Sequence, residues 1–162
     1  MRYADAVALL RTIPVFASLD AASLKLLAFS SSYLTFHDGE MLCREGEAGD
    51  SVFVIEAGEV VISKSQDGQC IKVAQLGCRD LFGEMAVICN LPRTADVHAR
   101  GTLKVLKIEG DVFLQLVTAN PDAALGVMRV LSKRLMHFTR LYQSMQYAHP
   151  EDSYPQLPSA GG

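Results

Sequence analysis

Residues 82–97 read FGEMAVICNLPRTADV, and this stretch carries the most informative chemistry of the chain. Gly83 and Glu84 open a short apolar helix, whose first turn has unpaired backbone N–H groups that attract an anion. Because Gly83 has no Cβ, a ligand can approach its backbone closely. Arg93 adds a permanent planar charge that can pair two phosphate oxygens, and the Glu84 carboxylate can accept hydrogen bonds from a sugar hydroxyl. The stretch therefore predicts a site for a phosphate attached to a ribose.

This stretch resembles the phosphate-binding cassette of the cyclic-nucleotide-binding domain family. The family pattern is F-G-E, an apolar residue, Ala, a hydrophobic run, R-[TSA]-A and Val, and every element is present: Phe82, Gly83, Glu84, Met85, Ala86, Val87, Ile88, Arg93, Thr94, Ala95 and Val97. Residues 10–19 (LRTIPVFASL) look like the family's helical lead-in, and residues 49–63 (GDSVFVIEAGEVVIS) look like its central hairpin. The resemblance extends to about residue 145 and is more specific than an isolated glycine motif.

The resemblance implies a receptor for a cyclic nucleotide rather than an enzyme, with neither catalytic residues nor metal ligands nor a cofactor. It implies close contacts of Gly83, Ala86 and Ala95 to the ribose phosphate. Glu84 is expected to accept from the ribose 2′-hydroxyl, and Arg93 to neutralise an equatorial phosphate oxygen. The expected ligand-binding set is Phe82, Gly83, Glu84, Met85, Ala86, Arg93, Thr94 and Ala95, and the candidates to cover the base are Arg134, His137, Phe138, Leu141 and Tyr142.

Thr94 bears on which cyclic nucleotide is bound. In the family a hydroxyl residue at this position is compatible with cyclic GMP, because it can reach the 2-amino group of guanine. Many cyclic AMP receptors of the family also carry a hydroxyl there, where it helps to hold the phosphate. We expect cyclic AMP rather than cyclic GMP.

Each cassette residue also has an ordinary structural explanation. Gly83 fits a plain turn, Glu84 fits the stabilisation of a helix N-terminus, and Arg93 fits a surface loop. Their joint occurrence favours binding. One alternative stays open, namely a dimerisation or interaction module that retains a vestigial cassette.

The remaining sequence predicts a mainly β fold with flanking helices, a small antiparallel barrel or jelly roll, and the family resemblance implies a double-stranded β-helix (jelly-roll) barrel. We expect one domain at 1–147, made of a helical lead-in at 1–30, a β-barrel at 31–109 and C-terminal helices at 111–147, followed by a disordered tail at 148–162. Asp20 is the predicted N-cap of the second helix. From Tyr33 the apolar period is two, and the turn signals are Asp38-Gly39, Glu45-Gly46, Ala57-Gly58, Asp67-Gly68 and Gly77. Spacing alone does not distinguish this barrel from other jelly rolls.

Beyond Gly110 the apolar period returns to that of a helix. Asp111 is the predicted N-cap of a helix at 112–118, and Asn120-Pro121-Asp122 predicts the start of a helix that runs to about Tyr147. Its apolar residues have heptad spacing: Ala124, Met128, Leu131, Leu135, Phe138, Tyr142 and Met145. This stripe either packs on its own barrel or pairs with a second copy. The length of the helix favours a homodimer through residues 121–147.

Composition and charge exclude several classes of protein. The 162 residues are 49% hydrophobic and carry a net charge of −3, which fits one domain and argues against a nucleic-acid-binding surface. We find neither a signal peptide nor an apolar run near the roughly 20 residues of a membrane span. The four cysteines form no C-x-x-C pair and the four histidines are scattered, so we expect no metal site. We predict that Cys43 and Cys70 are buried apolar residues of the core. We expect the protein to be in the reducing cytoplasm.

The output that such a domain usually controls is missing from this sequence. Only 17 residues follow Met145, which is too few for a winged helix-turn-helix. We expect either a stand-alone receptor that acts through an unknown effector protein or a regulatory domain separated from its effector.

Overall fold

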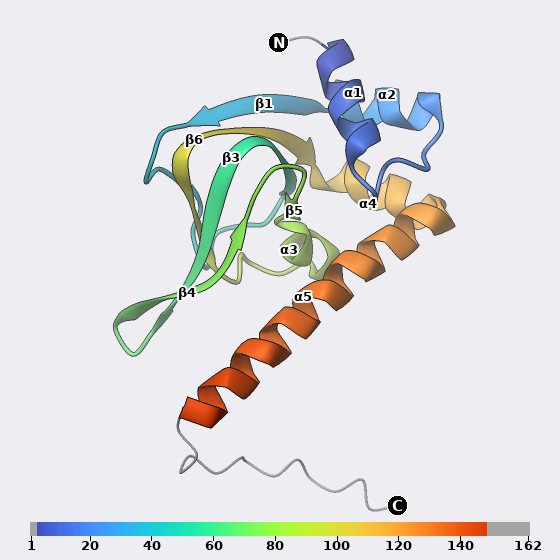
Figure 1. Ribbon diagram of the computed structural model, residues 1–162. Coiled ribbons are helices and arrows are strands. Elements are labelled where there is room, and N and C mark those ends of the chain that lie inside the picture. Colours follow the sequence, from blue (N-terminus) through green and yellow to red (C-terminus); the bar gives the residue numbers. More distant parts are fainter. Residues whose placement is uncertain (1–2, 149–162) are drawn as a thin grey trace, which may run out of the picture. The chain divides into compact units, whose positions relative to one another are not determined.

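The computed structural model describes residues 3–148 of the chain (Figure 1). They fall into two compact units, one that ends at Val127 and one that begins at Met128. The tail predicted at 148–162 lies outside the described residues, except for Ala148, which ends the last helix.

Two helices precede the sheet, α1 (Tyr3–Thr12) and α2 (Ala21–Phe29). The prediction that Asp20 caps the second helix is confirmed, because its carboxylate accepts from the Ser23 N–H at 2.8 Å. The hydrogen bonds from Ser23 lower the pKa of Asp20 below its ordinary value. The start of α2 is thus set by local capping as well as by its apolar residues.

Six strands form one antiparallel sheet, which confirms the mainly β fold with flanking helices (Figure 1). Four strands follow the order β1-β6-β3-β4, while β2 pairs with β6 and β5 pairs with β3. The strands are β1 (Ser31–Phe36), β2 (Met41–Cys43), β3 (Ser51–Gln66), β4 (Gln69–Leu76), β5 (Leu81–Phe82) and β6 (Asp96–Glu109). The two longest strands, β3 and β6, pair with each other and organise the rest.

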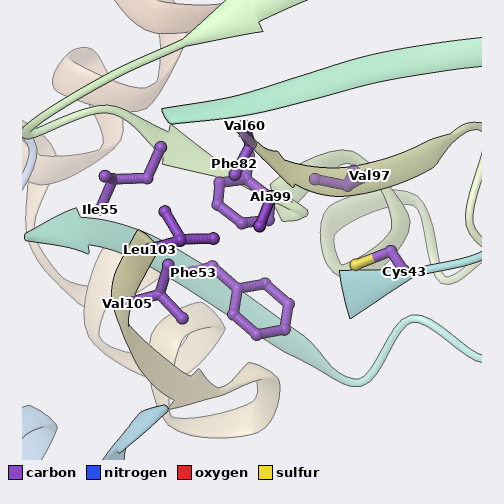
Figure 2. Close-up of a cluster of buried hydrophobic side chains, with 9 residues drawn as sticks. All are labelled: Cys43, Phe53, Ile55, Val60, Phe82, Val97, Ala99, Leu103 and Val105. Carbon is purple, nitrogen blue, oxygen red and sulfur yellow. The ribbon is translucent and has the colours of Figure 1, made fainter. Parts of the chain in front are cut away.

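The barrel interior is filled by a cluster of buried side chains, which Figure 2 shows: Cys43, Phe53, Ile55, Val60, Phe82, Val97, Ala99, Leu103 and Val105. Within it the rings of Phe53 and Phe82 stack, with centroids 5.0 Å apart and planes 11° apart. Burial raises the pKa of the Cys43 thiol, and the nearby charge of Arg93 acts in the opposite direction. The prediction for Cys43 is confirmed, but Cys70 is exposed. Cys70 lies in the part of the β3–β4 hairpin, residues 64–72, whose side chains are all exposed.

The predicted turn at Ala57-Gly58, and with it the central hairpin, is wrong. β3 continues through both residues, and the chain turns at Asp67-Gly68 instead. Gly58 has φ +94°, and the register with β6 shifts on both sides of Ala57. A left-handed glycine therefore forms a bulge in a continuous strand here.

Helix α4 (Gly110–Ala119) follows β6 directly, and its predicted N-cap is also wrong. The N-cap is Glu109, and Asp111 lies in the first turn. The helix starts earlier than predicted because a residue distant in sequence completes its N-terminus: the Gly110 N–H donates to the carbonyl oxygen of Asp50 at 2.8 Å.

Helix α5 (Pro121–Ala148) begins where predicted and runs without a break. In the first unit it buries Ala123 and Val127, and a Cβ on Gly126 would lie 2.9 Å from the Cα of Val15. In the second unit its exposed apolar residues include Met128, Leu135, Phe138, Tyr142 and Met145. No helix among residues 3–148 is long and apolar enough to cross a membrane.

We predict that Gly58→Ala destabilises the fold strongly. A Cβ at this position would collide with the backbone of Thr102 and Leu103 and would sit at a φ that side chains avoid. The left-handed conformation costs about 1–2 kcal/mol and overpacking about 1–3 kcal/mol, so the free energy of unfolding in urea should fall by about 2–5 kcal/mol.

The matched control is Gly101→Ala. Gly101 has φ +70°, but a Cβ at this position would meet nothing within 4 Å, so only the conformational cost of about 1–2 kcal/mol applies. Equal losses in the two variants would contradict the close packing at Gly58.

Candidate functional site

The centre of the site is Gly83, between β5 and the six-residue helix α3 (Glu84–Cys89). Its φ of +85° is left-handed, so the chain can turn sharply from strand to helix. A Cβ here would lie 2.7 Å from Arg93 Nη1, 3.1 Å from the Ser51 carbonyl oxygen and 3.4 Å from Phe53 Cδ2. Glycine is therefore required both by conformation and by the packing of three neighbours.

The Arg93 side chain is buried and is held by two backbone carbonyls. Nη1 donates to the carbonyl oxygen of Gly83 and Nη2 donates to that of Ser51, each at 2.8 Å. The guanidinium carbon also lies 5.7 Å from the ring centroid of Phe53. Because both acceptors are neutral, these bonds orient the guanidinium without cancelling its charge.

The backbone of Arg93 is fixed as firmly as its side chain. Its N–H donates to the Glu47 carbonyl and its carbonyl accepts from the Gly46 N–H, both at 2.8 Å. The loop that carries Arg93 begins after α3 at Asn90, which has φ +52° and caps the helix. Arg93 is thus tied to the turn that follows β2 and to the start of β3.

The remaining cassette residues differ in exposure. Glu84, in the first turn of α3, is fully buried, and Ala86 and Phe82 are nearly so. A Cβ on Gly49 would collide with the Cβ of Ala86, so position 49 has to be glycine for α3 to pack there. Three predicted residues are less enclosed: Ala95 is half-buried, while Met85 and Thr94 are exposed.

The candidates to cover the base lie on α5 beyond Val127, in the second unit. Arg134 is half-buried, whereas His137, Phe138, Leu141 and Tyr142 are exposed. Successive positions 134, 137–138 and 141–142 recur at the helical period, so they share one face of α5. Their role as a cap stays a prediction.

Sequence reasoning missed three residues that hold Arg93. The backbone carbonyl oxygens of Ser51 and Glu47 accept hydrogen bonds from Arg93. Every residue has such a carbonyl, so the residue types at these positions do not indicate the role. The sequence marks Phe53 only as an apolar strand residue, and its contact with Arg93 joins positions 40 residues apart in the chain.

Comparison with known proteins identifies the family. The family model described as "Cyclic nucleotide-binding domain" matches residues 33–120, more than half of the chain. The chain belongs to the cyclic nucleotide-binding domain family. The family is one of regulatory, ligand-binding domains rather than of catalysts. The match contains β2 to β6 and the whole cassette.

Solved structures of two protein kinase A regulatory proteins are similar to this chain. The regulatory domain of Toxoplasma gondii protein kinase A with cAMP is 29% identical, with a TM-score of 0.71 over 83% of this chain and 50% of that one. The regulatory subunit of a cAMP-independent protein kinase A from Trypanosoma brucei is 26% identical, with a TM-score of 0.72 over 89% of this chain and 51% of that one. The chain spans about half the length of these two structures.

The catabolite activator protein of Thermus thermophilus has the same fold. It is 22% identical, with a TM-score of 0.69 over 83% of this chain and 63% of that one. The predicted family and fold are therefore confirmed, while the roles of the individual site residues stay predictions.

We predict that Arg93→Ala destabilises the protein even without ligand. The change leaves the carbonyl oxygens of Gly83 and Ser51 without the donors that now satisfy them. Each buried unsatisfied group costs about 1–3 kcal/mol, so the loss of donors to both carbonyls should lower the free energy of unfolding in urea by about 2–6 kcal/mol.

The matched control is Arg100→Ala. Arg100 is exposed, and its guanidinium donates to a side-chain oxygen of Gln75 at 3.2 Å. An exposed substitution of this kind costs about 0.5 kcal/mol or less. A similar loss in both variants would mean that the carbonyl bonds of Arg93 contribute little.

Proposed function

We propose that this chain is a cyclic nucleotide receptor domain whose ligand phosphate binds at Arg93. The observation that carries the proposal is the buried Arg93 guanidinium, which is oriented by two neutral carbonyls beside Gly83. A guanidinium has five N–H donors, and these two bonds use only two of them. A buried, oriented positive charge of this kind is suited to a phosphate with two accessible oxygens.

The other cassette residues have complementary roles in the proposal. Glu84 accepts a hydrogen bond from the ribose 2′-hydroxyl, and its full burial supports a role for a carboxylate inside the site. Gly83, Ala86 and Ala95 are small and let the ribose phosphate approach the backbone. Together these residues select a ribose that carries a cyclic phosphate.

We propose cyclic AMP as the preferred ligand over cyclic GMP. The T. gondii structure was solved with cAMP. The T. brucei relative belongs to a cAMP-independent protein kinase A, so the titration has to compare both nucleotides. Thr94 is exposed, so its hydroxyl is free to meet either base or phosphate.

The proposed output is a movement of the C-terminal helix. A ligand shifts a helix only by the difference between its affinities for the two arrangements. A base contact from Arg134, His137, Phe138, Leu141 or Tyr142 that forms in one arrangement supplies such a difference. The signal then passes to an effector protein, and the domain itself needs neither catalysis nor a metal.

The binding test is isothermal titration of cyclic AMP, and then of cyclic GMP, into protein that was unfolded and refolded to remove co-purified nucleotide. We expect affinity in the micromolar range or tighter for one of them. Arg93→Ala should weaken it about 30- to 1,000-fold, because a buried phosphate loses a charged partner worth about 2–4 kcal/mol.

Two controls separate binding from folding. Circular dichroism checks that Arg93→Ala is folded at the temperature of the titration, and Arg100→Ala should bind as the wild type does. Binding by folded Arg93→Ala within threefold of wild type would refute the assignment of the phosphate site.

The exposed apolar stripe of the second unit favours a second candidate function, a dimerisation module. It includes Met128, Leu135, Phe138, Tyr142 and Met145 at heptad spacing. We propose that this stripe pairs two copies of the chain, whether or not the cassette binds a ligand.

Leu135→Asp tests the pairing. A buried charge in the seam should dissociate the dimer, so sedimentation velocity should show a monomer at concentrations where the wild type is dimeric. Ser144→Asp, a change at an exposed position with no stripe residue three or four positions away, should leave the dimer intact. Unchanged sedimentation of Leu135→Asp would exclude this stripe as the dimer interface. If the protein is a dimer but shows no binding heat in the titrations of cyclic AMP and cyclic GMP, a dimerisation module with a vestigial cassette is favoured.

A further inference from the structure

Phe53 is buried in the barrel, and its ring lies next to Arg93 and Gly83 of the candidate phosphate site. The guanidinium carbon of Arg93 lies 5.7 Å from its ring centroid. Its Cδ2 would lie 3.4 Å from a Cβ on Gly83. Phe53 thus contacts Arg93 and lies beside the backbone of Gly83, the two residues that the proposed function places at the phosphate.

The orientation of this ring is fixed by a second aromatic ring. Phe82 stacks on Phe53 with a centroid distance of 5.0 Å and an angle of 11°, and the two residues are partners in the β3–β5 pairing. Both rings belong to the cluster in Figure 2. Because the interior is closely packed, the plane of Phe53 cannot turn freely.

A fixed aromatic ring can orient an arginine. The face of an aromatic ring attracts a cation within about 6 Å, and the attraction is stronger away from water. Arginine is also costly to immobilise, because its side chain has many rotamers. A receptor that has already ordered its arginine binds the phosphate more tightly than one that must order it on binding.

We propose that Phe53 is a positioning residue that holds the Arg93 guanidinium ready for the ligand phosphate. The proposal rests on the proposed function, in which Arg93 binds the phosphate. The ring of Phe53 is then a third restraint on the Arg93 guanidinium, in addition to the carbonyls of Gly83 and Ser51. Phe53 would therefore affect ligand affinity as well as the packing of the core.

The first test is made without ligand. In ligand-free protein labelled with ¹⁵N, the Arg93 Nε–H should give one sharp resonance, displaced by the ring current of Phe53. Phe53→Leu should abolish the displacement and broaden or shift the signal. The matched control is Phe16→Leu, since Phe16 is equally buried but packs against Phe113 instead. That variant should leave the Arg93 signal unchanged.

The second test measures affinity in a double-mutant cycle, by titration of cyclic AMP. Phe53→Leu should weaken binding about 5- to 30-fold, and Phe16→Leu by less than about twofold even if it loses as much stability. In an Arg93→Gln background, Phe53→Leu should change the affinity by less than about twofold, because its effect passes through the guanidinium.

The outcomes separate this proposal from the proposed function. If Phe53→Leu weakens binding equally with Arg93 present or replaced, or leaves the Arg93 resonance unchanged, Phe53 is only a core residue and the proposal is overturned. If the wild type binds neither cyclic AMP nor cyclic GMP, the proposed function fails and the affinity part of this proposal fails with it. The ligand-free resonance still decides whether Phe53 orients Arg93.

Discussion

The antiparallel pairing of β3 with β6 is the constraint on which the rest of the site depends. The pairing begins at Ser51, the first residue of β3, and continues to Ser63 near the end of that strand, where Ser63 pairs with Asp96. Arg93 precedes Asp96 by three residues, yet its guanidinium reaches back to the carbonyl of Ser51. The strand pair has to curve back on itself to allow this bond. The bulge at Gly58 provides a local bend in β3.

At the start of β3, two neighbouring backbone carbonyl groups accept hydrogen bonds from residues that are distant in the sequence. The carbonyl of Asp50 accepts from the first N–H of α4, and the carbonyl of Ser51 accepts from Arg93. A buried arginine and the start of a helix are thus satisfied by adjacent backbone groups. Most of the order around Arg93 therefore comes from main-chain geometry, and in the proposed function the side chains of Arg93 and Glu84 supply the chemistry.

This division explains what the sequence could and could not predict. The family was predictable because its sequence pattern consists of residue types at short spacing, such as Gly83 and Glu84. The support of Arg93 by Ser51 was not, because a carbonyl oxygen is common to all residues and the two positions are 42 apart. The turn predicted at Gly58 is wrong because a left-handed glycine suits a bulge as well as a turn. The burial predicted for Cys70 is wrong because alternation in a strand does not show whether the hairpin extends past the core.

Helix α5 is seated in the first unit by its opening turns, where Gly126 lies directly against Val15. From there the helix continues unbroken to Ala148, about 30 Å at 1.5 Å per residue. In the proposed function, in which this helix moves, an unbroken helix of that length would act as a lever. Tilting it by about 10° at Gly126 would carry its far end by about 5 Å, roughly one helical turn. If the helix moves as proposed, small changes in the packing around Gly126 would therefore give large displacements at the far end of α5.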